Sequence, residues 1–526
     1  MPKSILKALI FAACASHTSV ALTAPSEQQI TAYAEHALSQ WQAPGMSIAV
    51  VKDGQAVYVG GVGVREQGKP ERMDADTLFT IASVSKAFTG MSAAMAVERG
   101  QIVWDQPIIQ TLPSFRLYDP YVTAEATIRD LLAHRVGVSG NYVNGMALTR
   151  EQMVGLLRDA KPAAAFRTRR VYSNLLYAAA GEAVANAAGM SWDDHMRTMI
   201  FEPLGMSASS TRSSALAEAP NRASSHVRDR QGAIRIDPFR PRGYWSMDNH
   251  APAGGINSTA RDMARWLEFQ VGDGEFRGRR LLSARNFAET HADQIIYQDR
   301  RWNSDPLEFL IGFEPVAYTL GWHSSFYQGR RTLWHGGGFR GHGCIALLDE
   351  QQKLGIFVFA NSRDGLRGLS SGVAQWILDR YLELPERDWS SEQKRRYDQR
   401  WAQMAQQEKA VLQRPARRKA PSAELQAYAG RYVARDSWEQ YELTQQGGRL
   451  RMNLQGMAEP FYAELEPWQG DAFRATWNEP VTEYEPAQIV SFTFGAQGRV
   501  HSMLLYRADS AQPDELYRVE STVPAP

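Results

Sequence analysis

The sequence predicts an α+β fold, in which an antiparallel sheet is flanked by helices, followed by a small all-β domain. Strand-like runs occur at 45–64 and again within 331–361, and a mostly helical and loop-rich stretch from about Thr127 to Leu267 separates them. Strands and helices segregated in this way are typical of an α+β sandwich. From Tyr428 onward, short alternating runs with Gly turns indicate a barrel. The 526 residues suffice for two or three domains.

The first residues are typical of a secretory signal peptide. Lys3 and Lys7 precede an apolar run over Ala8–Ala13, and small residues suited to cleavage end at Ala21. We therefore expect a signal peptide over 1–21 and a periplasmic or secreted protein. Two alternatives stay open, namely lipidation at Cys14 and a frayed cytoplasmic N-terminus. No other stretch approaches the roughly 18 to 20 apolar residues that a membrane span needs.

The charge balance argues against a nucleic acid or an anionic membrane as partner. The formal net charge is +1, with acids and bases interspersed, whereas binding to a polyanion uses a basic patch. We expect a small-molecule or short-peptide substrate, and the sequence leaves the oligomeric state open. Because Cys14 and Cys344 are the only cysteines, a chain without its leader has no intramolecular disulfide. Cys344 lies in an apolar strand-like run, so we interpret it as structural.

The first strands form a hairpin. The runs "GMSIAVVK" and "QAVYVGGVGV" meet at Asp53-Gly54, a turn signal. Later strands are predicted in "RTLWHGGGF", "GCIALLDE" and "LGIFVFAN", the last two joined at Gln351-Gln352. The hairpin has to join these later strands to complete one antiparallel sheet.

A helix is predicted after the hairpin, with Ser83 and Lys86 in its first turn. Apolar residues recur at i, i+4, i+7 and i+11, and Gly100 follows them as a C-cap: Val84, Phe88, Met91 and Met95. Side chains at i and i+3 share a helix face, so an amine would lie beside a hydroxyl. A buried lysine loses its charge readily and can then accept a proton, which would make Ser83 a nucleophile.

The S-x-x-K pattern alone is weak, because it also occurs at Ser4/Lys7 and Ser391/Lys394. Partners for Ser83 are expected from other segments. Tyr172 and Asn174 begin an alanine-rich helix, although a second Y-x-N occurs at Tyr142/Asn144. His335 starts the single H-x-G of the chain, in "LWHGGGFRGHG". Consecutive glycines in a strand are expected where another backbone approaches closely.

The carboxyl-terminal part divides into three segments. An amphipathic run over 373–382 looks like the end of the first domain, and a charged helix around Ser391–Leu412 and "QRPARRKAPSAE" look like a spacer and a linker. The predicted boundaries are 22–388 for the α+β domain, 389–421 for the helical spacer and linker, and 422–526 for the β domain.

The segments at Ser83, Tyr172 and His335, in this order, resemble the penicillin-recognising serine hydrolases. The closer likeness is to the branch of class C β-lactamases, D-Ala-D-Ala carboxypeptidase B, D-aminopeptidases and family VIII esterases. Two further stretches resemble this branch, "TIRDLLAHRVGVSG" and "AGGINSTARDMARWL". The likeness covers roughly Gln28–Leu382 and implies a β-lactamase-like domain. The tail resembles the lipocalin-like barrel domain that some members carry.

The resemblance implies a role for each motif residue. Ser83 would be acylated, and Lys86 would help to deprotonate it. Tyr172 would share the general-base work and pass a proton to the leaving group. Asn174 would hydrogen-bond Lys86 and the substrate amide. No metal or organic cofactor is implied.

The resemblance also implies that the H-x-G segment binds the substrate. The backbone N–H groups of Ser83 and Gly338 would form the oxyanion hole, and Gly336 and Gly337 would lie against the substrate. His335 is counted with the catalytic residues and stands where many relatives have a lysine. The β-lactam-recognising members usually read K-[ST]-G, whose cation and hydroxyl can hold a carboxylate, and no K-[ST]-G occurs in this chain. Strong β-lactamase activity is therefore not expected.

Other features of the sequence compete with this hypothesis. "GLSSG" matches the G-x-S-x-G of α/β-hydrolases and makes Ser370 a rival nucleophile, but the only later histidine is His501 in the tail. No zinc or Walker motif supports a metal or nucleotide mechanism. A rival from another class is a receptor that is acylated at Ser83 without turnover. We expect a serine hydrolase, acting first on peptides or amides that contain D-amino acids, second on a small ester and third on a β-lactam.

Overall fold

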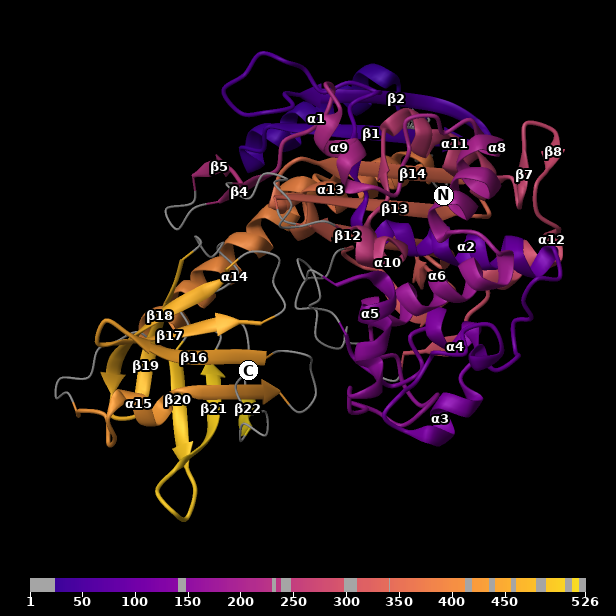
Figure 1. Ribbon diagram of the computed structural model, residues 1–526. Helices are drawn as coiled ribbons and strands as arrows, with labels where there is room; N and C mark the ends of the chain where they lie inside the picture. The colour runs from indigo at the N-terminus through magenta and orange to yellow at the C-terminus, as the bar shows by residue number, and fades with distance from the viewer. Residues whose placement is uncertain are drawn as a thin grey trace, which may run out of the picture.

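The computed structural model describes residues 24–140, 148–228, 233–237, 247–297, 310–339, 341–411, 419–434, 440–455, 460–478, 489–506 and 513–519. The predicted signal peptide over 1–21, with Cys14, lies outside these residues. Two bodies are visible in Figure 1, a domain of sheet and helices and a carboxyl-terminal barrel, and the helix α14 (Trp389–Val411) runs from the first toward the second. Among the described residues, no helix combines the length and apolar character that crossing a membrane requires.

An eight-stranded antiparallel sheet forms the middle of the first domain. Its strand order is β2-β1-β14-β13-β12-β11-β10-β9, and the strands are β1 (Gly45–Lys52), β2 (Gln55–Gly63), β9 (Ile295–Ile296), β10 (Glu314–Tyr318), β11 (His323–Tyr327), β12 (Arg330–Phe339), β13 (His342–Asp349) and β14 (Leu354–Ala360). Residues 46–52 of β1 pair with 354–360 of β14, so the predicted union of the first hairpin with the later strands is confirmed. The sequence did not predict β9, β10 and β11, which extend the sheet beyond β12.

The remaining elements of this domain are mostly helical. The helices are α1 (Glu27–Trp41), α2 (Ser85–Glu98), α3 (Pro120–Glu125), α4 (Ile128–Leu132), α5 (Arg150–Gly155), α6 (Asn174–Ala188), α7 (Trp192–Met196), α8 (Glu202–Leu204), α9 (Ser213–Glu218), α10 (Ala251–Gly254), α11 (Ala260–Val271), α12 (Ala284–His291) and α13 (Leu369–Tyr381). Shorter turns of helix are η1 (Ala82–Val84), η2 (Ile108–Gln110), η3 (Leu156–Arg158), η4 (Arg197–Phe201), η5 (Asp248–His250) and η6 (Arg363–Arg367). Three short strand pairs join them, namely β3 (Phe79–Thr80) with β6 (Asn257–Ser258), β4 (His226–Arg228) with β5 (Ile234–Ile236), and β7 (Glu275–Phe276) with β8 (Arg279–Arg280).

Helices cover both faces of the sheet. Successive residues of a strand point to opposite faces, so neighbouring residues of β1 belong to different cores. Ile48 and Val50 of β1 belong to a core that also contains residues of α1, α13 and α14. Ala49 and Val51 belong to a second core with residues of α2, α6 and α11. The predicted α+β domain, with an antiparallel sheet flanked by helices, is confirmed. The start of α14 is part of the first core, since Trp389 is only 3% exposed there.

The carboxyl-terminal body is the predicted all-β barrel. The short helix α15 (Leu425–Tyr428) precedes a closed barrel of eight strands, β15 (Gly430–Ala434), β16 (Gln440–Gln446), β17 (Arg449–Leu454), β18 (Tyr462–Gln469), β19 (Ala472–Trp477), β20 (Ile489–Phe494), β21 (Val500–Tyr506) and β22 (Asp514–Val519). Large side chains fill its core, and Tyr428, Tyr432, Met452 and Phe473 are fully buried in it. The barrel is therefore a packed unit over the described residues.

Candidate active site

Ser83 lies in η1, directly before α2, and its hydroxyl contacts two of the predicted partners. The hydroxyl of Tyr172 donates a hydrogen bond to Ser83 Oγ at 2.9 Å, and Lys86 Nζ lies 3.3 Å from the same oxygen. The expectation that Ser83 stands in the first turn of the helix needs a small correction. The 3-10 turn over Ala82–Val84 carries Ser83, and the α-helix begins at Ser85.

Lys86 is fully buried and is hydrogen-bonded to neutral oxygens. Its Nζ donates to Asn174 Oδ1 at 2.8 Å and to the carbonyl oxygen of Ala253 at 2.6 Å. Burial lowers the pKa of Lys86 well below its ordinary value, and the positive charge of Arg170 lowers it further. The neutral amine is thereby favoured, and a neutral amine can accept a proton.

The start of α6 fixes Tyr172 and Asn174. Ser173 is the N-cap of α6 and accepts a hydrogen bond from the N–H of Leu176. The N–H of Asn174 donates to the carbonyl of Gly140 at 3.1 Å. Because these bonds hold the chain at Ser173 and Asn174, Tyr172 and Asn174 face α2 from a defined backbone.

His335 is a buried, neutral residue of β12. Its Nδ1 lies 2.7 Å from the carbonyl oxygen of Gly336, and its Nε2 lies 3.0 Å from the hydroxyl of Tyr318. Burial lowers the pKa of His335 to about 3. A neutral ring that donates from Nδ1 accepts at Nε2, so Tyr318 is the donor to His335. The position that carries a lysine in many relatives is thus uncharged here.

The glycines after His335 allow β12 to approach the Ser83 turn on one side and η6 on the other. A Cβ on Gly337 would lie 2.3 Å from the carbonyl oxygen of Ile81, and one on Gly338 would lie 2.1 Å from a methyl group of Leu366. Strand β11 pairs with β12 only as far as Trp334. Beyond Trp334, within the described residues, the edge of β12 away from β13 has no strand partner, which is where a substrate backbone could lie.

Aromatic and histidine rings surround these groups, and sequence reasoning missed most of them. The ring of His134 lies 4.5 Å from that of Tyr172 and 5.0 Å from that of Tyr318, and the ring of His323 lies 5.0 Å from that of His335. His134 lies within the quoted stretch "TIRDLLAHRVGVSG", whereas the segment of His323, "HSSFY", has no pattern that marks it. The cluster is a product of the tertiary fold.

Arg170 is the other residue that the sequence did not single out. Its guanidinium carbon lies 5.2 Å from the ring centre of Tyr172 and 5.1 Å from that of Tyr318. It stands two positions before Tyr172, among other arginines in "FRTRRVYSN". Its position two residues before Tyr172 is the only sequence signal that could have identified Arg170 as a site residue.

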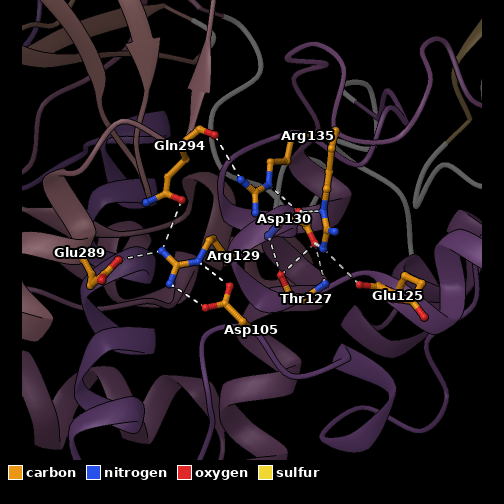
Figure 2. A network of polar contacts seen from close by, with 9 residues as sticks. Asp105, Glu125, Thr127, Arg129, Asp130, Arg135, Glu289 and Gln294 are labelled. Carbon is orange, nitrogen blue, oxygen red and sulfur yellow. Dashed lines mark hydrogen bonds and ion pairs between the residues drawn. The ribbon is translucent and has the colours of Figure 1, made fainter.

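A network of ion pairs supports the segment that leads to Tyr172 (Figure 2). The buried carboxylate of Asp130 accepts from Arg135 Nε at 2.5 Å and from Arg167 Nη2 at 2.7 Å. Burial raises the pKa of Asp130, but Arg167 and Arg135 outweigh it and hold the pKa below its ordinary value. In the same view, Arg129 Nη1 pairs with Glu289 at 2.8 Å. The network therefore connects α4, the segment before α6, and the end of α12.

The residues of the alternative motifs do not form a nucleophile–base arrangement like that of Ser83 in the described part of the chain. Ser370 is buried in α13 and its hydroxyl donates to the carbonyl of Gly343, so the nucleophile-elbow hypothesis is wrong. Ser391 and Lys394 lie on α14, where Lys394 pairs with Asp398. Ser4, Lys7, Tyr142 and Asn144 fall outside the described residues.

Cys344 is buried, and burial raises the pKa of its thiol. No group of three or more potential metal ligands occurs in the part of the chain that the structure describes.

The family model described as Beta-lactamase matches residues 30–374. The chain belongs to this family. The resemblance, the fold class and the assignment as a serine hydrolase are therefore confirmed. A second model, for a domain of unknown function (DUF3471), matches residues 414–521, which include the barrel.

Known proteins similar to this chain carry hydrolase or penicillin-binding descriptions. The Unguisins hydrolase ungD of Aspergillus violaceofuscus is 29% identical over 422 residues, which are 75% of this chain and 73% of the relative. The octameric penicillin-binding protein homologue from Pyrococcus abyssi is 20% identical with a TM-score of 0.59, and the match covers 93% of this chain and 99% of that chain. The D-amino acid amidase from Ochrobactrum anthropi SV3 is 23% identical with a TM-score of 0.54, over 70% and 98% of the two chains. The two structural matches show a shared fold.

Proposed function

We propose that this β-lactamase-family serine hydrolase forms an acyl-enzyme at Ser83 and cleaves amide bonds in peptides or amides that contain D-amino acids. One observation carries the proposal. Ser83 Oγ lies 2.9 Å from the hydroxyl of Tyr172 and 3.3 Å from the amine of Lys86, whose pKa is lowered by burial. A nucleophile beside a base that a third group orients is the arrangement that acyl transfer needs, and Asn174 is the orienting group.

The first half of the reaction follows from these contacts. The proton of Ser83 Oγ passes to the Lys86–Tyr172 pair as the oxygen attacks the scissile carbonyl carbon. The N–H groups of Ser83 and Gly338 receive the oxyanion of the tetrahedral intermediate. Tyr172 then delivers a proton to the departing amine nitrogen as the C–N bond breaks, which leaves the acyl group on Ser83.

Water completes the cycle. The same pair removes a proton from a water molecule, the hydroxide oxygen bonds to the acyl carbon, and Ser83 leaves with its proton restored. Each proton that the base accepts is returned within one turnover, so the cycle needs no metal or organic cofactor.

The substrate class is supported by His335 and by the similar proteins. His335 is uncharged, so the β12 position that is a cation in many relatives is a neutral acceptor and donor in this chain. Similarity to a D-amino acid amidase and to a hydrolase of unguisins is in line with amide chemistry. A small ester is the second candidate, and a β-lactam is the third.

Intact-protein mass spectrometry tests the nucleophile. The protein is exposed to a fluorophosphonate and, separately, to a penicillin, as wild type, Ser83→Ala and Ser391→Ala. Ser391 is the matched control because it heads another S-x-x-K in the chain. We expect an adduct that maps to Ser83, is absent from Ser83→Ala and persists in Ser391→Ala. An adduct that survives Ser83→Ala, or none at all in wild type, would overturn the proposal.

Turnover separates an enzyme from a receptor that is acylated and stays acylated. We expect release of the leaving group from D-alanine p-nitroanilide in large molar excess over the enzyme, and much less from the L-isomer. A single equivalent released in a burst, followed by a stable adduct, would favour the receptor.

We also propose that the protein is exported by its leader and acts in the periplasm or outside the cell. The charged and apolar pattern over 1–21 supports this. The mature protein from the native host is expected to begin at Leu22. A mature N-terminus at Met1 would contradict export by cleavage, and a lipid-modified Cys14 would indicate an anchored form.

A further inference from the structure

Arg170 places a positive charge beside the proposed catalytic groups. Its guanidinium carbon lies 5.2 Å from the ring centre of Tyr172, 5.1 Å from that of Tyr318 and 5.7 Å from that of Tyr297. The hydroxyl of Tyr172 reaches Ser83 Oγ, and the hydroxyl of Tyr318 reaches His335. The guanidinium therefore stands on the side of Tyr172, the group that would protonate the leaving group.

This cation has no anion among the described residues. Arg170 makes no ion pair or hydrogen bond there, and its Nε is buried without a hydrogen-bond partner. Arginine has five N–H donors in a planar fork that matches a carboxylate. A buried donor without a partner is unfavourable, so the resting site gains from a ligand that supplies an acceptor and a negative charge.

Carboxylates on the neighbouring elements are already paired with other arginines. Asp130 binds Arg135 and Arg167. Asp293, which precedes β9 by two residues, binds Arg331 at 2.9 Å. Arg135, Arg167 and Arg331 are thus each paired with a carboxylate, whereas Arg170 is paired with none among the described residues.

The other basic groups of the site are held neutral, which isolates the charge further. Burial lowers the pKa of Lys86 well below its ordinary value and lowers that of His335 to about 3. His134 also has a pKa well below its ordinary value because it is buried. Arg170 is left as the formal positive charge beside Tyr172 among the described residues.

The backbone that carries Arg170 is fixed. The N–H of Val171 donates to the carbonyl of His134 at 2.8 Å, and the N–H of Arg167 donates to the carbonyl of Arg135 at 2.7 Å. The Asp130 network lies against the same segment (Figure 2). A cation on a fixed backbone is suited to recognition, because little order has to be gained on binding.

We propose that Arg170 binds a carboxylate of the substrate on the leaving-group side of the scissile bond, so that the preferred substrates end in a free carboxylate next to the amide that is cleaved. This inference rests on the proposed function. Arg170 is then a specificity residue. It lies in the segment before α6 and provides the positive charge that β12 lacks at His335. A peptide with an amidated C-terminus would lose this contact.

The test measures binding in a Ser83→Ala background, so that its result does not depend on acylation. N-acetyl-D-alanyl-D-alanine and its C-terminal amide are titrated separately by calorimetry. The proteins are Ser83→Ala alone and with Arg170→Gln, Arg170→Lys or Arg169→Gln. Arg169 is the matched control, because it lies on the same segment, is exposed, and donates to the carbonyl of Ala163.

The expected result is a preference for the acid over the amide of at least about tenfold in Kd, the scale of one charge-assisted contact. Arg170→Gln should remove the preference by weakening the acid alone, Arg170→Lys should keep part of it, and Arg169→Gln should keep it whole. Equal binding of acid and amide, no binding of either at millimolar concentration, a preference that survives Arg170→Gln, or an equal loss in Arg169→Gln would overturn the proposal. Failure of the proposed function has a different signature, the absence of a Ser83 adduct in the labelling experiment.

Discussion

Replacement of Lys86 by methionine tests whether the amine beside Ser83 is neutral in the folded protein. The pKa of Lys86 is lowered well below its ordinary value, first by burial and then by Arg170. In the unfolded chain a lysine has a pKa of about 10.4, so it carries a proton at every lower pH. Between the lowered folded value and the unfolded value, unfolding therefore takes up one proton, and the stability of the wild type rises with pH.

The size of this effect follows from one proton. Uptake of one proton on unfolding changes the free energy of unfolding by about 1.4 kcal/mol for each pH unit. From about pH 8 to about pH 9.5 the wild type should gain about 2 kcal/mol relative to Lys86→Met, which has no amine to titrate. The gain is largest near the unfolded pKa and is lost as the pH falls toward the folded one.

Urea denaturation followed by tryptophan fluorescence measures the slope over this interval. Lys69→Met is the control, because it removes a lysine whose side chain is 54% exposed. A slope change that appears in both variants is not due to burial. Parallel lines for the wild type and Lys86→Met would refute the reasoning, because they would mean that the buried amine is protonated in the folded state. Lys86→Met should also label with fluorophosphonate at least about 100-fold more slowly, since general-base help is lost.

Three further outcomes are expected. Tyr172→Phe should slow amide cleavage at least about 100-fold, and should slow acylation by a fluorophosphonate less, because the fluoride leaving group needs less help from a proton. Asp130→Asn should lower the free energy of unfolding by about 3 kcal/mol, since Arg135 and Arg167 lose a buried carboxylate, and a smaller loss in urea titration would show that water replaces it. His335→Lys should raise kcat/KM for carboxylate-bearing substrates relative to neutral ones, and an unchanged ratio would contradict the importance of this position.

The parts of the site that the sequence predicts are those whose residues lie close together in the chain, so that a helix alone sets the distance between them. Ser83 and Lys86 are three residues apart at a helix start, so their proximity is local. Tyr172 and His335 are distant in sequence, and only their resemblance to motifs of the family linked them to Ser83. The first hairpin was predictable from Asp53-Gly54, and its union with the later strands followed because a single hairpin cannot bury both of its faces.

The parts that the sequence did not predict depend on tertiary contacts. Strands β9 to β11 are short, and "HSSFY" mixes polar and aromatic residues without alternation, so no period identified them. Tyr318 and His323 therefore had no predicted place. Arg170 was indistinguishable from its neighbours Arg167 and Arg169, because the difference between them is which one finds a partner. That difference exists only in the folded chain.

The pairing of β1 with β14 has a consequence for how the active site comes into being. Met46 pairs with Ala360, so the β1–β14 strand pair joins segments that are more than half the chain apart. Contacts of such long range form slowly, and an emerging chain carries its first hairpin without a partner until β14 has been made. The hairpin presents apolar residues on both faces during this interval. Acylation of Ser83 would thus report that β14 has joined the sheet, and a truncation anywhere before residue 360 should abolish both the sheet and the label.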